Sequence, residues 1–461
     1  MQGSHAWRAD GAMFDDENLV SCAGLVPMLE LAEQAGLSRL LSEHVQFTSE
    51  RVKSGAANAT PKLTAIIAGM AAGADSIDDL DVIRSGGMHK LFGGVYACAT
   101  LGIFLREFTF GHVRQLAAVL RRLLVALAAR TPVLAGIEQR CYLDIDSLLR
   151  PVYGKTKQGA SFGHTKIAGK NILRRGLSPL AVTISTDTAA PVLAGVRLRA
   201  GRAGSSKGAT SMIVEAITTA IAAGAQPETI LVRADSAFCA GKLIAAVVKA
   251  GAMFSVAIAR NSLVDAAIAS IPDEQYVPVH YPGAVVDPDT GRLISDAQVA
   301  EVEYTAFAGT PYQITGWLVV RRVVDANTQD PLFPVWRHHP FFTNNTEPAP
   351  EADITHRAHA ICETVWSDLI DGPWAHQPSG SFPANAAWTT LAAICHNLLR
   401  AAGAITGLAR YAVARGATVR EHIINVPARL ARPQRRSTLH LPKHWPHAKP
   451  WQGLWTAVFL T

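Results

Sequence analysis

Long hydrophobic runs are missing from this 461-residue sequence. Its apolar stretches are short or are interrupted by charged residues and glycine, so none reaches the length of a transmembrane helix. The segment from Met1 to Asp15 is polar and acidic, and it lacks the apolar centre of a secretory signal. We therefore expect a cytoplasmic protein with no membrane partner.

Cysteine and charge are both scarce. The six cysteines are scattered, and no two of them form a CxxC pair. Such spacing excludes a disulfide framework or a cysteine zinc module and indicates reduced thiols. Charged residues make up 17% of the chain and hydrophobic residues 49%, proportions typical of a folded protein. The HExxH pattern of zinc hydrolases and the phosphate-binding P-loop are absent as well.

Positive charge is concentrated in two regions. The net charge is +6 and the pI is about 9.0, which permits a polyanionic partner but does not require one. Residues 410–449 contain nine lysines and arginines and a single acidic residue, Glu421. Residues 150–175 hold a second basic group that includes Lys155 and Lys166. Two basic segments far apart fit a groove that follows DNA phosphates, although an ordinary solvated surface would have the same composition.

The spacing of apolar residues changes along the chain. Residues 17–130 have helical spacing, most clearly in the amphipathic segment 112–130. After Gly136 the spacing becomes that of strands at 140–149, 180–186 and 192–198, and helices and strands then alternate up to Ala259. This alternation predicts an α/β fold with a mixed sheet and flanking helices.

The rest of the chain differs in composition. Residues 262–350 are rich in Pro, Tyr, Val and Thr and predict strands, and helical spacing returns at 354–369 and 386–402. We divide the chain into five segments, which are a helical N-terminal DNA-binding domain (1–135), the first part of a catalytic core (136–262), a β-rich insertion (263–350), the second part of the core (351–405) and a basic C-terminal segment (406–461). A helical domain that serves only in packing is equally compatible with the pattern of the first segment.

Two acidic residues lie inside a predicted strand at 140–149. Residues two apart in a strand point the same way, so Asp144 and Asp146 share one face while Leu143 and Ile145 occupy the other. A carboxylate within an apolar strand is costly unless it is paired or binds a metal. A satisfied polar residue at a strand end is the alternative explanation for one of them.

A third acidic residue, Asp235, follows the short apolar strand 230–234. Open α/β sheets place their chemistry at such carboxyl ends. A helix N-cap formed by Asp235 or Ser236 would explain the same pattern. The sequence alone leaves both interpretations open.

The fourth acidic residue is Glu363, in a predicted helix. Helical spacing would bring His356, His359 and Glu363 to one face, together with Ser367 and Ile370. Glu363 could then reach the sheet with two imidazoles beside it. A solvated glutamate on a surface helix is the simpler interpretation.

Together these carboxylates suit a hard metal ion. Oxygen ligands from a first strand, a later strand end and a late helix are those that Mg²⁺ or Mn²⁺ prefers. Two such ions about 4 Å apart can activate a water or a 3′-hydroxyl and stabilise the leaving oxygen of a phosphodiester.

Several segments resemble those of bacterial insertion-sequence DDE transposases, specifically the group with a β-rich insertion before the catalytic glutamate. The resemblance lies in segments spread over nearly the whole chain, which are Ala71–Leu80, Thr100–Arg106, Leu143–Ser147, Val232–Phe238, the helix with Glu363, Ala375–Gly380 and Phe382–Trp388.

This resemblance implies a ribonuclease H-like catalytic core with two divalent ions, Mg²⁺ or Mn²⁺. It also implies binding of double-stranded DNA at transposon ends and at the target, a homodimer in the synaptic complex, and a place near the bacterial nucleoid. The family pattern has an Asp followed by a small hydroxyl residue or glycine on the first strand, which Asp146 matches better than Asp144. We therefore assign Asp146, Asp235 and Glu363 as catalytic metal ligands, with Asp144 in reserve.

The sequence departs from the family pattern around the glutamate. Related transposases often have Tyr, Arg and Lys where this chain has His356, His359 and Ile370. A histidine can still contact a phosphate, whereas the missing lysine bears on the positioning of the DNA end. The residues that we expect to contact DNA are His356, Arg357, His359, Lys155, Lys166 and Arg233.

Two other functions are compatible with parts of the pattern. A metal-dependent hydrolase would use His356, His359 and Glu363 as zinc ligands, and tightly bound zinc would identify it. A non-catalytic or decayed relative of the transposases would keep the basic segments and lose the chemistry. Loss of strand cleavage in Asp235→Ala and Glu363→Ala variants, with DNA binding retained, would favour the transposase.

Overall fold

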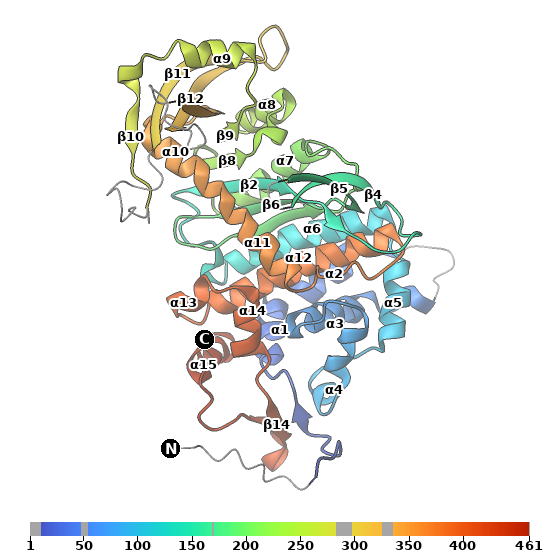
Figure 1. Cartoon of the computed structure of the whole chain (residues 1–461). Coiled ribbons are helices and arrows are strands. Elements are labelled where there is room, and N and C mark those ends of the chain that lie inside the picture. Colours follow the sequence, from blue (N-terminus) through green and yellow to red (C-terminus); the bar gives the residue numbers. More distant parts are fainter. Residues whose placement is uncertain (1–10, 48–53, 168–169, 283–296, 325–334, 461) are drawn as a thin grey trace, which may run out of the picture.

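A nine-stranded mixed sheet runs through the middle of the molecule (Figure 1). The computed structural model describes residues 11–47, 54–167, 170–282, 297–324 and 335–460. The strand order is β10-β11-β12-β13-β9-β8-β2-β6-β7. The strands are β2 (Cys141–Ser147), β6 (Leu180–Ser185), β7 (Val192–Arg197), β8 (Ile230–Ala234), β9 (Met253–Ala257), β10 (Val277–Val279), β11 (Ala297–Ala306), β12 (Ile314–Val324) and β13 (Trp336–Thr343).

The centre of this sheet is parallel and its two sides are antiparallel. Strand β2 pairs in parallel with β8, and β8 pairs in parallel with β9, while β6 and β7 continue antiparallel from β2. Helices α7 (Ala209–Ala222) and α8 (Gly241–Lys249) connect these strands. The predicted α/β fold with a mixed sheet and flanking helices is therefore confirmed.

The β-rich segment extends the same sheet. Strand β13 pairs antiparallel with β9, with Phe341 opposite Ala257, and β12, β11 and β10 follow outward. Helix α9 (Ser262–Ala269) packs on this part through Val264 and Ile268, which share a buried cluster with Leu318. The predicted insertion therefore adds strands to the edge of the core sheet.

A helical layer precedes the sheet in the chain and lies below it in Figure 1. Its helices are α1 (Leu25–Gln34), α2 (Leu37–His44), α3 (Ala59–Ala72), α4 (Met88–Leu91), α5 (Cys98–Arg106) and α6 (Phe110–Ala128). Helix α6 agrees with the amphipathic segment predicted at 112–130. It begins at a reciprocal cap between Thr109 and His112, and it buries Leu116, Leu120 and Leu127.

Helix α12 (Phe382–Ala404) joins the helical layer to the sheet. It contacts α3, α5, α6 and β7, and nearly every residue from Ala384 to Ala404 is buried. One apolar core therefore runs from Leu25 in α1 through α12 to the strands. No helix in the described part of the chain is both long and apolar enough to cross a membrane.

The two ends of the described chain meet. Strand β1 (Leu19–Val20) pairs with β14 (Ala428–Ala431), which in turn pairs with β15 (Thr438–His440). Helix α15 (Ala448–Phe459) packs on α1, where the side-chain amide of Gln34 donates to the carbonyl of Val458 at 2.9 Å. The short helices α13 (Ala409–Ala412) and α14 (Gly416–Val419) lie between α12 and these strands.

A separate three-stranded sheet lies between β2 and β6 in the chain, where the sequence patterns predicted no strands. It consists of β3 (Arg150–Pro151), β4 (Ser161–Ile167) and β5 (Lys170–Leu177) in the order β3-β5-β4. Apolar and basic residues are mixed in these strands, so the regular alternation that marks a half-buried strand is absent.

The helix predicted at 354–369 is two helices. Helix α10 (Ala349–Arg357) ends in a 3₁₀ turn, η7 (Ala358–Ile361), and α11 (Cys362–Ile370) follows. A 3₁₀ turn has three residues per turn instead of 3.6, so it rotates the following residues relative to those before it. The single face predicted for His356 and Glu363 is therefore lost, with His356 buried and Glu363 exposed.

Candidate active site

Asp146 and Asp235 lie side by side at the carboxyl ends of neighbouring parallel strands. In the register of β2 and β8, Ile145 is opposite Ala234, and each of these residues immediately precedes one of the two aspartates. The carboxyl edge of parallel strands is where open α/β sheets place their chemistry. The strand pairing therefore brings together Asp146 and Asp235, which are 89 residues apart in the sequence.

Asp146 is held by two hydrogen bonds. Its Oδ1 accepts the backbone N–H of Ser147 at 2.6 Å, and its Oδ2 accepts the indole N–H of Trp366 at 2.8 Å. The pKa of Asp146 is raised to about 6, mainly by burial and to a smaller extent by the negative charges of Asp235 and Glu363, while the two hydrogen bonds oppose the rise. Asp235 and Glu363 are thus close enough to influence Asp146.

Asp235 acts as an N-cap and still leaves one oxygen available. It precedes the 3₁₀ turn η5 (Ser236–Phe238), and its Oδ1 accepts the backbone N–H of Ala237 at 2.9 Å. The residue is exposed at the strand end. The capping and the site interpretations are therefore compatible, because the cap fixes one carboxylate oxygen and not the other.

Glu363 lies in the first turn of α11, and Figure 1 shows α11 crossing over the sheet. Its side chain is exposed, and no hydrogen bond or ion pair of it is found within the described residues. Trp366, three residues further on, bonds Asp146 and thereby holds α11 against the end of β2. This contact places Glu363 at the same edge of the sheet as the two aspartates.

No pattern in the sequence selects Trp366 or Cys362, because a tryptophan and a cysteine in a helix are usually core residues. Both face Asp146 from α11, where the Cys362 thiol lies 4.0 Å from Asp146 Oδ2. Burial raises the pKa of the Cys362 thiol, and the charge of Asp146 raises that pKa further. Cys362 is therefore a neutral neighbour of the site, and Trp366 is the residue that orients Asp146.

The donor set fits a hard divalent cation. It consists of carboxylate oxygens, and the pKa of Asp146 is raised mainly by burial and to a smaller extent by the charges of Asp235 and Glu363. Within the described ranges, no three His, Cys, Asp or Glu side chains lie close enough together to hold a metal ion as they stand. The predicted zinc grouping of His356, His359 and Glu363 is thus not formed there either.

Asp144 is engaged elsewhere. Its two oxygens accept Nε and Nη2 of Arg233 at 2.7 and 2.8 Å, and the two side chains are only 1% and 2% exposed. Arg233 also donates to the carbonyl of Thr355 at 2.9 Å and lies 4.2 Å from the ring centre of Tyr142. We therefore withdraw Asp144 as a reserve metal ligand and Arg233 as a DNA contact, because the pair satisfies itself inside the protein.

His356 is buried in the same region. Its ring stacks on Phe341 with ring centres 4.2 Å apart, and its Nδ1 lies 2.9 Å from the hydroxyl of Ser255. Burial lowers the pKa of His356 to about 3, and the nearby His359 lowers that pKa as well. The imidazole is neutral and enclosed, so we withdraw the prediction that it contacts a DNA phosphate.

The other predicted DNA contacts are more accessible. Arg357 is exposed and lies over the ring of Tyr281 at 4.2 Å, while the partly exposed His359 donates from Nδ1 to the carbonyl of His356 at 2.6 Å. Lys155 is exposed in the loop between β3 and β4. The side chain of Lys166, in β4, lies outside the part of the chain that the structure describes.

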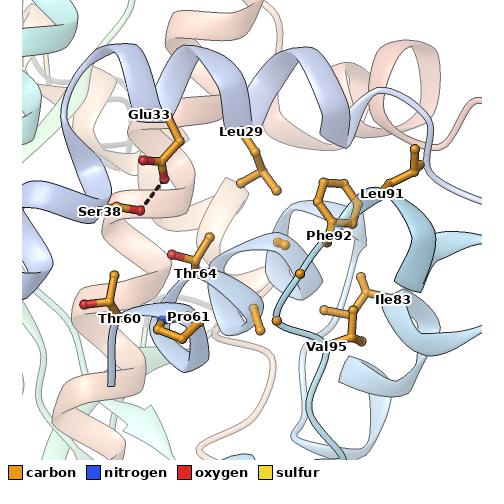
Figure 2. Close-up of a pocket in the computed structure, with 14 residues that line it drawn as sticks. Leu29, Glu33, Ser38, Thr60, Pro61, Thr64, Ile83, Leu91, Phe92 and Val95 are labelled. Atoms are coloured by element: carbon orange, nitrogen blue, oxygen red, sulfur yellow. Dashed lines mark hydrogen bonds between the residues drawn. The ribbon is translucent and has the colours of Figure 1, made fainter. Parts of the chain in front are cut away.

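A separate cavity of about 370 Å³ lies in the helical layer, between α1, α3 and the segment after α4 (Figure 2). Its wall is mostly apolar, with Leu29, Ile83 and Phe92 among its residues. Its single carboxylate, Glu33, accepts the hydroxyl of Ser38 at 2.5 Å. This cavity contains none of the three candidate ligands and offers no comparable chemistry.

The raised pKa of Asp146 predicts a pH-dependent cost to stability. The pKa is about 6 in the folded protein against an ordinary value of 3.8. The free energy of unfolding therefore falls as the pH rises past 3.8, and the loss is complete above about pH 6. With a chelator present, Asp146→Asn should raise the melting temperature at pH 8 by about 2 °C or more and leave it unchanged near pH 4. An equal gain at both pH values would contradict this account.

Comparison with protein families gives one match that spans the chain. Residues 10–458 match the family described as transposase DDE domain group 1. No curated protein matches the sequence. The nine-stranded mixed sheet with flanking helices is consistent with the ribonuclease H-like fold that this family implies. Because the match covers almost all of the 461 residues, the chain belongs to the DDE transposase family.

Proposed function

We propose that this transposase binds the terminal inverted repeats of an insertion sequence and catalyses divalent-metal-dependent DNA strand cleavage and strand transfer. The observation that carries the proposal is the position of Asp146 and Asp235 at the ends of neighbouring parallel strands, where Trp366 holds α11, the helix with Glu363, against Asp146. Membership of the DDE transposase family supports the same chemistry.

Asp146, Asp235 and Glu363 would hold the metal ions, Mg²⁺ or Mn²⁺. When bound, two such ions activate a water or 3′-hydroxyl and stabilise the leaving oxygen. Burial and, to a smaller extent, the charges of Asp235 and Glu363 raise the pKa of Asp146, and a cation at the site would stabilise its charged form against both. Asp144 is not part of the proposed set, since its charge is balanced by Arg233 in a buried ion pair, whereas Asp146 accepts only from neutral donors.

The protein orients these ligands through its own hydrogen bonds. The Trp366 indole and the Ser147 amide fix the Asp146 carboxylate, and the Ala237 amide fixes that of Asp235. Glu363 has no such restraint among the described residues, so its orientation depends on α11. Hydrogen bonds thus orient the carboxylates of Asp146 and Asp235, whereas the carboxylate of Glu363 can change its orientation.

DNA would approach along exposed basic residues. Arg357 and His359 lie just before Glu363 in the chain, and Lys155 lies beyond β2. The tail adds a group of exposed arginines, Arg432, Arg435 and Arg436. We propose that these residues contact phosphates of transposon and target DNA, that two copies of the chain assemble in the synaptic complex, and that the protein acts in the cytoplasm.

Strand cleavage tests the proposed function directly. The purified chain is incubated with DNA that carries the terminal repeats flanking its gene, with Mg²⁺, Mn²⁺, Zn²⁺ or a chelator. We expect cuts at the repeat ends and joined products with Mg²⁺ or Mn²⁺ only. Binding without cleavage in any metal would instead identify a non-catalytic relative, and activity restricted to Zn²⁺ would identify a hydrolase.

A further inference from the structure

A polar cavity of about 450 Å³ is lined by residues that follow β2 in the chain, beginning at Arg150, four residues after Asp146. We call it the Arg150 pocket, after a residue in its wall. One wall is β3 and the loop after it, with Arg150, Tyr153 and Lys157, and the other is the segment with His376 and Gln377 between α11 and α12. No carboxylate is among its lining residues in the described chain.

The two cations of this pocket lack a counter-charge. Arg150 donates from Nη2 to the carbonyls of Trp374 and Ala375 at 2.9 and 3.0 Å, and Lys157 donates from Nζ to the carbonyl of Gln377. No ion pair of either cation is found in the described part of the chain. Because half-buried cations held only by carbonyls are poorly compensated, an anionic group in the pocket would stabilise them.

The pKa directions agree with this geometry. Burial lowers the pKa of Arg150, and no neighbouring carboxylate raises it. Burial also lowers the pKa of Lys157, and the charge of Arg175 lowers that pKa further. Arg150 and Lys157 therefore carry uncompensated charge, while His376 in the same wall contacts the Asp75 carboxylate at 3.0 Å.

The walls of the Arg150 pocket are tied together. Arg175 in β5 donates to the carbonyls of Gly154 and Lys155 at 2.6 and 3.1 Å, which fixes the loop that carries Tyr153. The amide of Gln158 donates to the carbonyl of Gly380 at 3.0 Å across the two walls. The pocket is thus preformed by backbone contacts, and a ligand would not have to order it.

Two side chains in the walls suit a nucleobase. Tyr153 is 90% exposed, so its ring is free to stack on a base. Gln377 is only 6% exposed, yet neither its amide nitrogen nor its amide oxygen has a hydrogen-bond partner. An amide can both donate to and accept from the polar edge of a base, and the buried amide lacks such a partner in the protein.

The pocket is linked to the active site through two tryptophans. Arg150 follows Asp146 by four residues. On the other wall, the Trp374 ring packs on Trp366 with ring centres 5.4 Å apart, and Trp366 bonds Asp146. A DNA strand at the carboxylates would therefore pass close to the pocket.

We propose that the Arg150 pocket binds an unpaired nucleotide of the DNA strand next to the bond that is cut or joined. The nucleotide's phosphate faces Arg150 and Lys157, and its base stacks on Tyr153 within reach of Gln377. This inference rests on the proposed function, because it takes the ligand to be the DNA on which the carboxylates act. An unpaired nucleotide is required because a paired base has no free face for Tyr153.

Metal-free DNA binding tests the pocket. Fluorescence anisotropy compares a duplex that has unpaired 3′ nucleotides with the fully paired duplex, in the presence of a chelator. Tyr153→Ala and Lys157→Gln should weaken binding of the overhang duplex about tenfold and leave that of the paired duplex within about twofold. Tyr153→Phe should bind like the parent, because its ring is kept.

Lys249→Gln is the matched control for charge. This exposed lysine ends α8 and precedes β9, so it lies at the edge of the sheet opposite to the carboxylates. It should leave the preference for the overhang unchanged. Equal binding of the overhang by the parent and by Tyr153→Ala, in variants that melt like the parent, would overturn the inference.

The outcomes for the pocket and for the proposed function are separable. If the parent cleaves DNA and the pocket variants bind the overhang normally, the pocket assignment fails and the transposase function stands. If the parent never cleaves but its overhang preference depends on Tyr153, the pocket assignment stands and the catalytic proposal fails.

Discussion

Asp235→Asn and Glu363→Gln are each expected to lower strand cleavage by about a thousandfold or more, equivalent to ~4 kcal/mol of transition-state stabilisation. Each change replaces a charged oxygen ligand by a neutral amide of the same shape. Asparagine at position 235 can still accept the Ala237 amide that Asp235 now caps, so the local turn is preserved. The loss would therefore reflect the site and not the fold.

Glu228→Gln provides the matched control for these two changes. Glu228 is exposed in the turn before β8, at the opposite end of the strand from Asp235. Its cleavage rate should equal that of the parent, and all three variants should bind the end DNA with parental affinity. Cleavage that persists in Asp235→Asn or in Glu363→Gln would show that the ligand assignment is wrong.

Arg233→Met should destabilise the protein by about 3–5 kcal/mol, because it leaves the Asp144 carboxylate buried without a partner. Both side chains of this pair lie next to the sheet centre, and water has little access to either of them. The double variant Asp144→Leu with Arg233→Met should recover most of the loss, since it removes both charges and keeps apolar volume. Denaturant unfolding monitored by circular dichroism measures the three variants.

An exposed ion pair serves as the comparison. Arg260 and Asp265 are joined at 2.7 Å with side chains 52% and 45% exposed, and Arg260→Met should cost no more than about 1 kcal/mol. If Arg233→Met were as mild as Arg260→Met, then the Asp144–Arg233 pair would not be the buried anchor inferred from its geometry.

The core strands and α6 could be predicted because their patterns are local. The run Ile230–Ala234 is apolar except for Arg233, and it forms β8 with those bounds. The amphipathic stripe of α6 is likewise set by residues within one helix. In contrast, β3, β4 and β5 were missed, because their stability comes from pairing with one another and their side chains show no regular alternation.

The sequence by itself determined which carboxylates share a face and which ones end strands. Asp144 and Asp146 point the same way because they are two apart in β2, and Asp235 follows a buried strand. Only the tertiary structure distinguished the two strand carboxylates. Arg233 neutralises Asp144 from the next strand, whereas Trp366 bonds Asp146 and leaves it near Asp235 and Glu363. Both partners are distant in sequence, so no local pattern could reveal which carboxylate is paired and which is available to bind a metal ion.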